Sequence, residues 1–439
     1  MKILYLCSEA YPFVKTGGLA DVMYALPRKM RGLGHEISLF LPKYDLIPKI
    51  YTDKMKYVNS IQIHDEIYNL YTLVQDEINY YFIENRTFFE RGHIYGDLDE
   101  DVQYTNFCEA ILKFLIKLGL EFDVIHCNDW QTGVFPYFMK TRYHIPAKTV
   151  YTIHNLLYQG KFNNYSFNKL GYMTDRYNLN FMEIGIEYSD VVNTVSPTYA
   201  KEIKYPYFAQ GLEWITNKKN ILGILNGIDY DYYKPIDNKK EYKTKLLNTF
   251  NLPDNGNMLI CVISRLVEGK GIDLIVARLE DILIHDKISV IIIGTGNKYY
   301  ENFFSYLESK YPDKIKTYMG NSEELALLTY KGSDCLLMPS RYEPCGLSQM
   351  IAMRYGTVPI VRETGGLKDT VKAFDTGTKK GNGFTFSNFN ADDMLYTIRY
   401  AKKIYFEQKE NFNILRNNCL NTNNSWNIAA KLYEKLYKN

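Results

Sequence analysis

A lysine and a pair of glycines follow the first apolar run of the sequence. The run Ile3 to Cys7 is typical of a buried strand, and Lys15-Thr16-Gly17-Gly18 precedes a stretch with helical spacing. Glycines let the backbone approach an oxyanion, the following helix points N–H groups at it, and the lysine adds a positive charge. The opening therefore predicts a site for nucleotide phosphates, with an ordinary strand-to-helix turn as the alternative interpretation.

Two cations and a carboxylate occupy comparable places in the second half of the chain. Arg265 and Lys270 follow the apolar run Leu259 to Ser264, and Glu343 lies in the loop after Cys335 to Met338. Ligands of α/β proteins bind at the carboxyl ends of parallel strands. Two cations there can neutralise a diphosphate leaving group, and a carboxylate can bind sugar hydroxyls or a developing cation. The alternative is that both cations are solvated surface residues.

A third segment repeats the order of the first. Thr364-Gly365-Gly366 follows the apolar run Val358 to Val361 and precedes another helical stretch. This glycine pair predicts a second ligand-binding turn, and a plain turn is again the alternative. The acidic run Asp97 to Asp101 could in principle hold a metal ion, but it lies in a polar loop before a helix. We interpret it as helix capping and a solvated turn.

Alternating apolar runs and helical stretches predict the elements that position these residues, in the βαβ order of a parallel sheet. A polar passage rich in Lys and Asn, from Asp237 to Asn257, predicts a linker between two doubly wound domains. We expect an α/β protein with domains at 1–236 and 237–424. A final helix at 425–439 is expected to pack back on the first domain.

Composition excludes several classes of protein. The 52 basic and 50 acidic residues leave a net charge of +2 without a dense basic stripe, which argues against a nucleic-acid partner. Seven cysteines without a C-x-x-C pair indicate reduced thiols. No apolar segment is long enough to span a bilayer, so we expect a cytoplasmic protein that has no membrane partner.

Longer motifs carry a resemblance to a known family. They are KTGGLADV from Lys15, HCNDWQTG from His126, TIHNLLYQG from Thr152, TVSPTYAKEI from Thr194, NGID from Asn226 and PSRYEPCGLSQ from Pro339. Together they are similar to bacterial glycogen synthases and the related starch synthases, in the family's order and over nearly the whole chain.

The resemblance implies a GT-B fold, in which two Rossmann-like domains face each other across a deep cleft. It also implies retaining transfer of glucose from ADP-glucose to the non-reducing end of an α-1,4-glucan such as glycogen, with no metal and no cofactor. Two alternatives stay open: a related glucosyltransferase with another donor or acceptor, such as UDP-glucose, and an inactive glucan-binding homologue. Nothing in the sequence indicates the oligomeric state.

By the same resemblance, Lys15 lies near the donor phosphates, and Arg265 and Lys270 stabilise the departing ADP. Glu343 binds donor glucose hydroxyls, and His154 faces the donor glucose. The other implied donor-binding residues are Gly17, Gly18, Asp21, Asn155, Cys345, Gly346, Leu347, Thr364 and Gly365. The implied acceptor-binding residues are Asp129, Trp130 and Gln131.

Three positions depart from the family pattern. Gln131 stands where many relatives carry His, and Gly269 stands where Gln is common. Gln210 lies in a segment that is usually richer in glycine. These departures put acceptor and donor contacts in question, but the cationic pair is retained.

Overall fold

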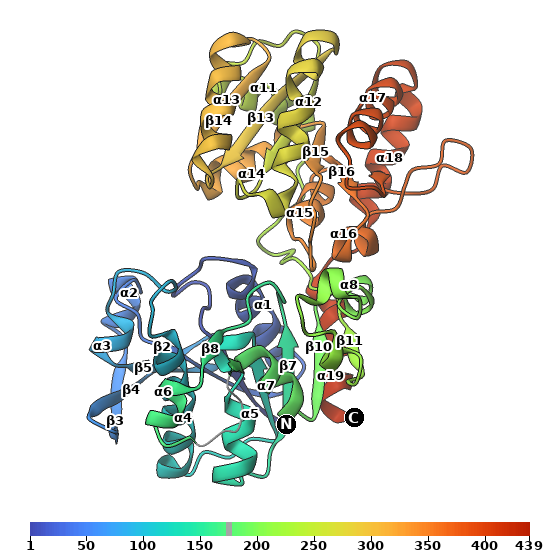
Figure 1. Cartoon of the computed structure of the whole chain (residues 1–439). Coiled ribbons are helices and arrows are strands. Elements are labelled where there is room, and N and C mark those ends of the chain that lie inside the picture. The colour runs from blue at the N-terminus through green and yellow to red at the C-terminus, as the bar shows by residue number, and fades with distance from the viewer. Residues whose placement is uncertain (173–177) are drawn as a thin grey trace. The chain divides into compact units, whose positions relative to one another are not determined.

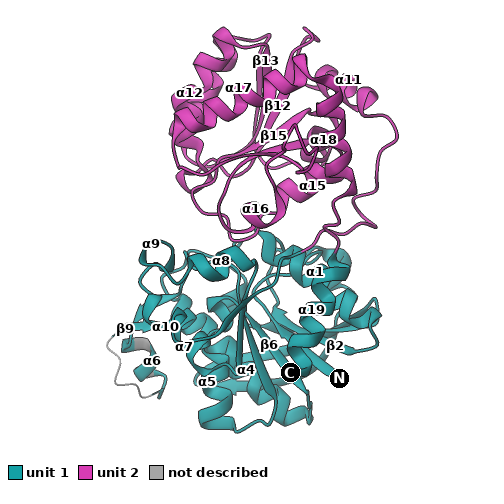
Figure 2. Ribbon diagram, turned by 90° about the vertical axis from the view of Figure 1, so that its right-hand side faces the viewer, with its two compact units in different colours: residues 1–226, 426–439 teal, residues 227–425 magenta. Residues whose placement is uncertain are grey.

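The computed structural model describes residues 1–172 and 178–439, which form two compact units. Unit 1 contains Met1–Asn226 and Trp426–Asn439, and unit 2 contains Gly227–Ser425 (Figure 2). The chain thus passes from unit 1 to unit 2 at residue 226, whereas the expected domain boundary was residue 236. Its last helix returns to unit 1.

Unit 1 is built on a nine-stranded sheet with the order β11-β10-β7-β6-β1-β2-β5-β4-β3. The strands from β11 to β5 are parallel, and β4 and β3 add an antiparallel edge. The strands are β1 (Lys2–Leu6), β2 (Glu36–Pro42), β3 (Lys56–Ile63), β4 (Glu66–Gln75), β5 (Ile78–Glu84), β6 (Val124–Asn128), β7 (Lys148–Ile153), β10 (Val191–Thr194) and β11 (Ile221–Gly223). A separate two-stranded sheet pairs β8 (Lys161–Asn163) with β9 (Asn178–Asn180).

The helices of unit 1 are α1 (Gly18–Gly32), α2 (Lys49–Thr52), α3 (Arg86–Phe89), α4 (Glu100–Leu118), α5 (Phe135–Phe138), α6 (Tyr165–Lys169), α7 (Phe181–Tyr188), α8 (Pro197–Glu202), α9 (Pro206–Ala209), α10 (Glu213–Thr216) and α19 (Trp426–Lys438), with the short turns η1 (Trp130–Thr132) and η2 (Met139–Tyr143). Helices α1, α4, α7 and α8 pack against this sheet, and the other helices lie around them (Figure 1). The central strands are buried on both faces, as the run Ile3 to Leu6 shows with no exposed side chain.

Unit 2 has a six-stranded parallel sheet with the order β14-β13-β12-β15-β16-β17. Its strands are β12 (Met258–Ile263), β13 (Ile288–Gly294), β14 (Ile315–Met319), β15 (Cys335–Met338), β16 (Val358–Arg362) and β17 (Phe384–Phe386). Its helices are α11 (Lys239–Thr249), α12 (Ile272–His285), α13 (Lys298–Lys310), α14 (Glu323–Gly332), α15 (Ser348–Arg354), α16 (Gly365–Thr370), α17 (Ala391–Glu407) and α18 (Lys409–Asn421), with the turn η3 (Glu268–Lys270). The predicted class of two doubly wound α/β domains is confirmed.

The polar passage expected as a linker contains helix α11 instead. Asn238 caps this helix by accepting a hydrogen bond from the N–H of Glu241, and Leu246 and Leu247 are buried in the core of unit 2. Two buried leucines on an otherwise charged helix are enough to dock it, although they give a weak periodic signal in the sequence.

Helix α19 is tied to unit 1 by a buried polar chain. The hydroxyl of Tyr437 lies 3.1 Å from that of Tyr5 on β1 and 2.8 Å from Nδ1 of His126 on β6. Burial lowers the pKa of His126 to about 3, so its ring is neutral near pH 7 and one nitrogen must accept.

The same chain continues across the sheet. Thr152 Oγ donates to Oδ1 of Asn193 at 2.8 Å, so it accepts from Nε2 of His126 at 2.6 Å. Asn193 in turn donates to the hydroxyl of Tyr433 at 3.1 Å. His126 therefore carries its proton on Nε2 and accepts from Tyr437 at Nδ1, so every link has a donor and an acceptor.

We predict that Tyr437→Phe lowers the free energy of unfolding of unit 1 by about 1–3 kcal/mol, because Tyr5 and His126 each lose a buried partner. All three tryptophans, Trp130, Trp214 and Trp426, lie in unit 1, so tryptophan fluorescence during denaturant titration reports this unit alone. The matched control is Tyr205→Phe at an exposed position, which should leave the transition unchanged. Equal transitions for both variants would contradict the structural role of the chain.

Candidate active site

The loop after β1 is organised by a buried carboxylate, Glu9. Its side chain accepts hydrogen bonds from the N–H and hydroxyl of Thr16 and from the N–H of Gly17. Burial raises the pKa of Glu9, and these hydrogen bonds oppose the rise. The N–H of Gly17 is thus used within the protein, so in this conformation Gly17 shapes the loop and does not offer its amide to a ligand.

Lys15 lies on the exposed side of the same loop. Its ammonium group lies 2.7 Å from a carboxylate oxygen of Asp21, in the first turn of α1. Helix α1 begins at Gly18, which itself lies exposed. A carboxylate at a helix N-terminus is stabilised by the helix dipole, so Asp21 can fix the lysine beside that helix end.

A second group of polar residues follows β6, which lies next to β1 in the sheet, and β7, which lies next to β6. Asp129 has φ of 54° and ψ of −178°, a conformation that non-glycine residues rarely adopt. Its Oδ1 accepts from the N–H of His154 at 2.8 Å and from that of Asn155 at 3.4 Å. Burial raises the pKa of Asp129 to about 7, and the charge of Glu9 adds to the rise. Burial lowers the pKa of His154 to about 3, so this ring is neutral near pH 7.

Trp130 and Gln131 do not fit the acceptor-binding role expected for them. Trp130 is 6 % exposed, and its ring packs against Tyr104 and Phe162 at centroid distances of 5.0 and 5.7 Å. A Cβ atom added at Gly160 would lie 2.4 Å from the same ring. Gln131 is also buried. Both side chains belong to the core of unit 1, which leaves Asp129 as the one accessible member of the expected trio.

The carboxylate and one of the cations of unit 2 form a pair. Nζ of Lys270 lies 2.6 Å from Oε2 of Glu343, and the hydroxyl of Ser340 donates to the same oxygen at 3.0 Å. Glu343 is almost fully buried, whereas Arg265, just after β12, is exposed. A buried carboxylate requires such a partner, because an unpaired charge is strongly disfavoured away from water.

The loop that carries Glu343 is held between two glycine turns. A Cβ atom at Gly271, where φ is 70°, would lie 2.1 Å from the carbonyl oxygen of Pro339. One at Gly365, where φ is 44°, would lie 2.1 Å from the carbonyl oxygen of Glu343. Only glycine fits both the conformation and the close approach at these positions. These close approaches fix the position of the loop at Pro339 and at Glu343.

The remaining donor-side positions surround this loop. Thr364 is buried at the start of α16, and Leu347 precedes α15. Gln349 donates to the carbonyl oxygens of Cys345 and Gly346, both at 3.0 Å. The backbone of this turn is thereby fixed by a side chain of the helix that follows it.

Two residues that matter for this geometry were not predicted. Glu9 has no sequence signal beyond an acid that directly follows an apolar strand. Arg362 donates to the carbonyl oxygens of Ser340 and Arg341 at 3.3 and 3.0 Å, and both arginines lie over the ring of Phe389. These contacts join residues far apart in the chain, which spacing along the sequence does not reveal.

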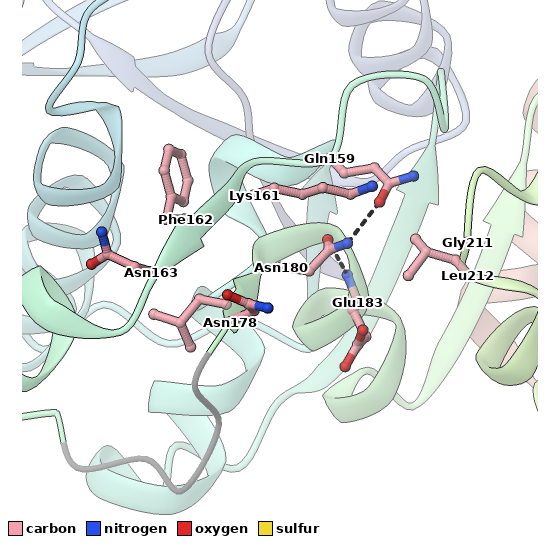
Figure 3. A pocket seen from close by; sticks show the side chains of 10 residues that line it. Gln159, Lys161, Phe162, Asn163, Asn178, Asn180, Glu183, Gly211 and Leu212 are labelled. Carbon is pink, nitrogen blue, oxygen red and sulfur yellow. Dashed lines mark hydrogen bonds between the residues drawn. The ribbon is translucent and has the colours of Figure 1, made fainter.

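A hollow of about 410 Å³ lies elsewhere in unit 1, beside the β8–β9 sheet (Figure 3). Residues of 159–163, 178–183 and 211–212 line it, and Asn180 donates to Gln159 at 2.7 Å on its wall. Among the described residues that line it there is no member of the expected site.

Within residues 1–172 and 178–439, no three His, Cys, Asp or Glu side chains gather where they could hold a metal ion. In the acidic run, Asp97 and Asp99 pair with Arg91. None of the helices described has the length and apolarity needed to cross a membrane.

Comparison with known families divides the chain at nearly the same place as its two units. Residues 2–218 match the model of the starch synthase catalytic domain, and residues 245–414 match that of glycosyl transferases group 1. The glycogen synthase of Alkaliphilus metalliredigens is 41 % identical over 100 % of this chain and 99 % of its own length. That of Desulfitobacterium hafniense is 42 % identical, with the same coverage.

Solved structures give a consistent result. The catalytic domain of starch synthase IV from Arabidopsis thaliana, bound to ADP and acarbose, superposes with a TM-score of 0.89 at 29 % identity, over 100 % of this chain and 98 % of that one. Sucrose-phosphate synthase from Thermosynechococcus elongatus shares the fold alone, with a TM-score of 0.66 at 16 % identity over 100 % and 98 % of the two chains.

The raised pKa of Asp129 predicts a stability change that depends on pH. An unfolded aspartate ionises near pH 4, whereas folded Asp129 keeps its proton until about pH 7, so its burial costs stability increasingly as pH rises between these values. We expect Asp129→Asn, which stays neutral and keeps an acceptor oxygen, to raise the melting temperature more at pH 8 than at pH 4. Differential scanning calorimetry at both values tests this. A shift of equal size at the two pH values would show that Asp129 does not titrate in this range.

Proposed function

Because the chain belongs to the glycogen and starch synthase family and is a glycosyltransferase, we propose that it transfers glucose from ADP-glucose to the non-reducing end of an α-1,4-glucan, with retention of configuration. The observation that carries this proposal is identity near 40 % with glycogen synthases along the entire chain. The GT-B fold agrees with it. The choice of ADP is supported by the ADP bound to the starch synthase IV domain.

In unit 2, we propose that Arg265 and Lys270 receive the charge of the departing ADP. Cations that already lie beside the diphosphate stabilise it as it leaves, because the protein does not have to rearrange during the reaction. Lys270 is already paired with Glu343, which keeps its ammonium group directed at the strand ends when no donor is bound. Glu343 would bind donor hydroxyls with its other oxygen. The backbone of Cys345, Gly346, Leu347, Thr364 and Gly365 would form the adjoining wall of the donor site.

In unit 1, we propose that Lys15 approaches the donor phosphates after leaving Asp21. The two groups are about one-third to two-fifths exposed, and an exposed ion pair contributes only about 0–1 kcal/mol, so a phosphate can displace Asp21 at little cost. Gly18 would present its amide at the start of α1, and Gly17 would hold the loop. His154 and Asn155 would lie on the donor side, and Asp129 nearer the acceptor.

The acceptor's proton needs a base, and neither the ring of His154 nor the carboxylate of Glu343 is a strong candidate for it. His154 has a pKa of about 3 and is a weak base, and Glu343 is occupied by Lys270 and Ser340. We propose that an oxygen of the leaving phosphate takes the proton while the new bond forms on the same face of the sugar. In that scheme the protein positions the two substrates and neutralises the charge of the leaving diphosphate. No side chain becomes covalently attached to glucose.

The donor and the metal requirement are tested together by incubating the purified protein with glycogen and either ADP-glucose or UDP-glucose, with and without a chelator. We expect incorporation of labelled glucose from ADP-glucose that the chelator does not reduce. Greater incorporation from UDP-glucose would overturn the donor assignment, and loss with the chelator would overturn metal independence. No incorporation from either donor would favour a different acceptor or an inactive homologue.

The cationic and carboxylate residues give a second test. We expect Lys15→Ala and Glu343→Ala each to lower kcat/KM by roughly 100-fold or more, since a positioned charge contributes a few kcal/mol to the transition state. Lys49→Ala and Glu324→Ala remove the same charges from exposed sites of the same units and should leave kcat/KM unchanged. Circular dichroism checks folding. Activity near that of the parent protein in both test variants would remove these residues from the site.

A further inference from the structure

Asn128, the last residue of β6, holds the ring of His154. Its amide nitrogen donates to the carbonyl oxygens of Leu6 at 3.0 Å and His126 at 3.3 Å. Its oxygen Oδ1 lies 2.9 Å from Nε2 of His154. The Asn128 side chain is completely buried, so none of these contacts can be exchanged for water without cost.

The partners of Asn128 determine which way its amide faces. Two carbonyl oxygens can only accept, so the NH₂ group must face Leu6 and His126. The amide oxygen must then face His154, and it too can only accept. Nε2 of His154 therefore carries the proton, and Nδ1 of the neutral ring is left with its lone pair.

The other end of His154 is also fixed. Its backbone N–H donates to Asp129 at 2.8 Å, so the residue is held both at the main chain and at the far nitrogen of the ring. No hydrogen bond to Nδ1 is found among the residues that the structure describes, and the side chain is partly exposed. The arrangement leaves one polar atom of His154 for a ligand, and that atom is an acceptor.

We infer that Asn128 is a positioning residue that selects the Nε2–H tautomer of His154, so that Nδ1 accepts a hydrogen bond from a sugar hydroxyl. The inference rests on the proposed function for the identity of the ligand, but the tautomer does not depend on it. In this state His154 can orient a hydroxyl, and it cannot donate a proton from Nδ1 to the leaving group.

The ionisable groups around the ring agree with a neutral histidine. Burial keeps the pKa of His154 near 3. Among the described residues, burial raises the pKa of Asp129 to about 7, Glu9 has a raised pKa, and His126 is neutral. None of them is hydrogen-bonded to the ring nitrogens of His154, so the contact with Asn128 alone sets the tautomer.

The tautomer can be read directly from long-range ¹H–¹⁵N spectra of the full-length protein labelled at histidine, without substrate. The His154→Ala spectrum identifies the signals of that ring. We expect the Nε2–H pattern at pH 7, with no titration of the ring down to pH 5. The Nδ1–H pattern, or a mixture of both, in the unaltered protein would overturn the inference whether or not the enzyme is active.

Variants at Asn128 then test the consequence for the reaction. Asn128→Asp keeps an acceptor next to Nε2 but adds a negative charge, which should raise the pKa of His154 and favour the imidazolium. We expect its ring to titrate above pH 5 and its kcat/KM to fall, by about 10-fold or more, as pH is lowered through that new pKa. Asn128→Ala should give a mixture of the two neutral tautomers of His154 and a loss of kcat/KM that does not depend on pH.

The matched control is Cys127→Ala, the preceding buried residue of β6. It disturbs the packing of the same strand without touching His154, so it should keep the Nε2–H pattern and the pH profile of the unaltered enzyme. A pH profile for Asn128→Asp that follows that of Cys127→Ala would show that Asn128 acts only through the stability of the strand, and would overturn the inference.

Discussion

The burial of parallel strands on both faces is the constraint on which the rest of the structure depends. Strand β13 is buried along its whole length, and β1 is buried at every residue after Lys2. The interior of these strands therefore has no place for charged side chains, and those of the candidate site lie in the loops after the strands. Glu9, Asp129 and His154 follow three neighbouring strands of unit 1, and Lys270 and Glu343 follow two neighbouring strands of unit 2. The reactive side chains gather at these strand ends because the buried interior of the sheet cannot hold charged groups.

The burial of these strands also explains how much of the fold could be predicted from the sequence. The parallel strands are short runs of apolar residues, and the predicted runs Ile3 to Cys7 and Cys335 to Met338 coincide with β1 and β15 to within a residue. The antiparallel strands β3 and β4 were missed because they are only partly buried and polar residues interrupt their apolar ones. Helix α11 was missed because its polar composition outweighs its two buried leucines. The local sequence pattern therefore predicts strands that are buried on both faces, and it misses strands and helices that contact the core on one face only.

For the candidate site, the roles of the chemistry-bearing side chains stay predictions, and their hydrogen-bond and ion-pair partners were not predicted. Lys270 and Glu343 were both expected, but their pairing at 2.6 Å joins residues 73 positions apart in the chain. Glu9 and Asn128 serve the site by orienting other groups, and a residue with that role needs no motif of its own. Trp130 illustrates the converse error: a strand end predicts an accessible side chain, yet aromatic packing on several sides placed it in the core.

The three departures from the family pattern have different physical weight. A Cβ atom at Gly269 would meet nothing within 4 Å, so a side chain is accommodated there and its absence removes a contact without reshaping the turn. Gln131 is buried, so the difference from relatives that carry histidine there changes the packing of the core and not directly an acceptor contact. Gln210 adopts φ of 52°, a conformation that favours glycine, and its carbonyl oxygen accepts from Gln159 at 3.1 Å. Holding a glutamine there costs about 1–2 kcal/mol, so these backbone contacts must hold the segment against that strain. Of the three positions, Gln210 is the one where replacing glycine most directly affects the energy of the backbone conformation.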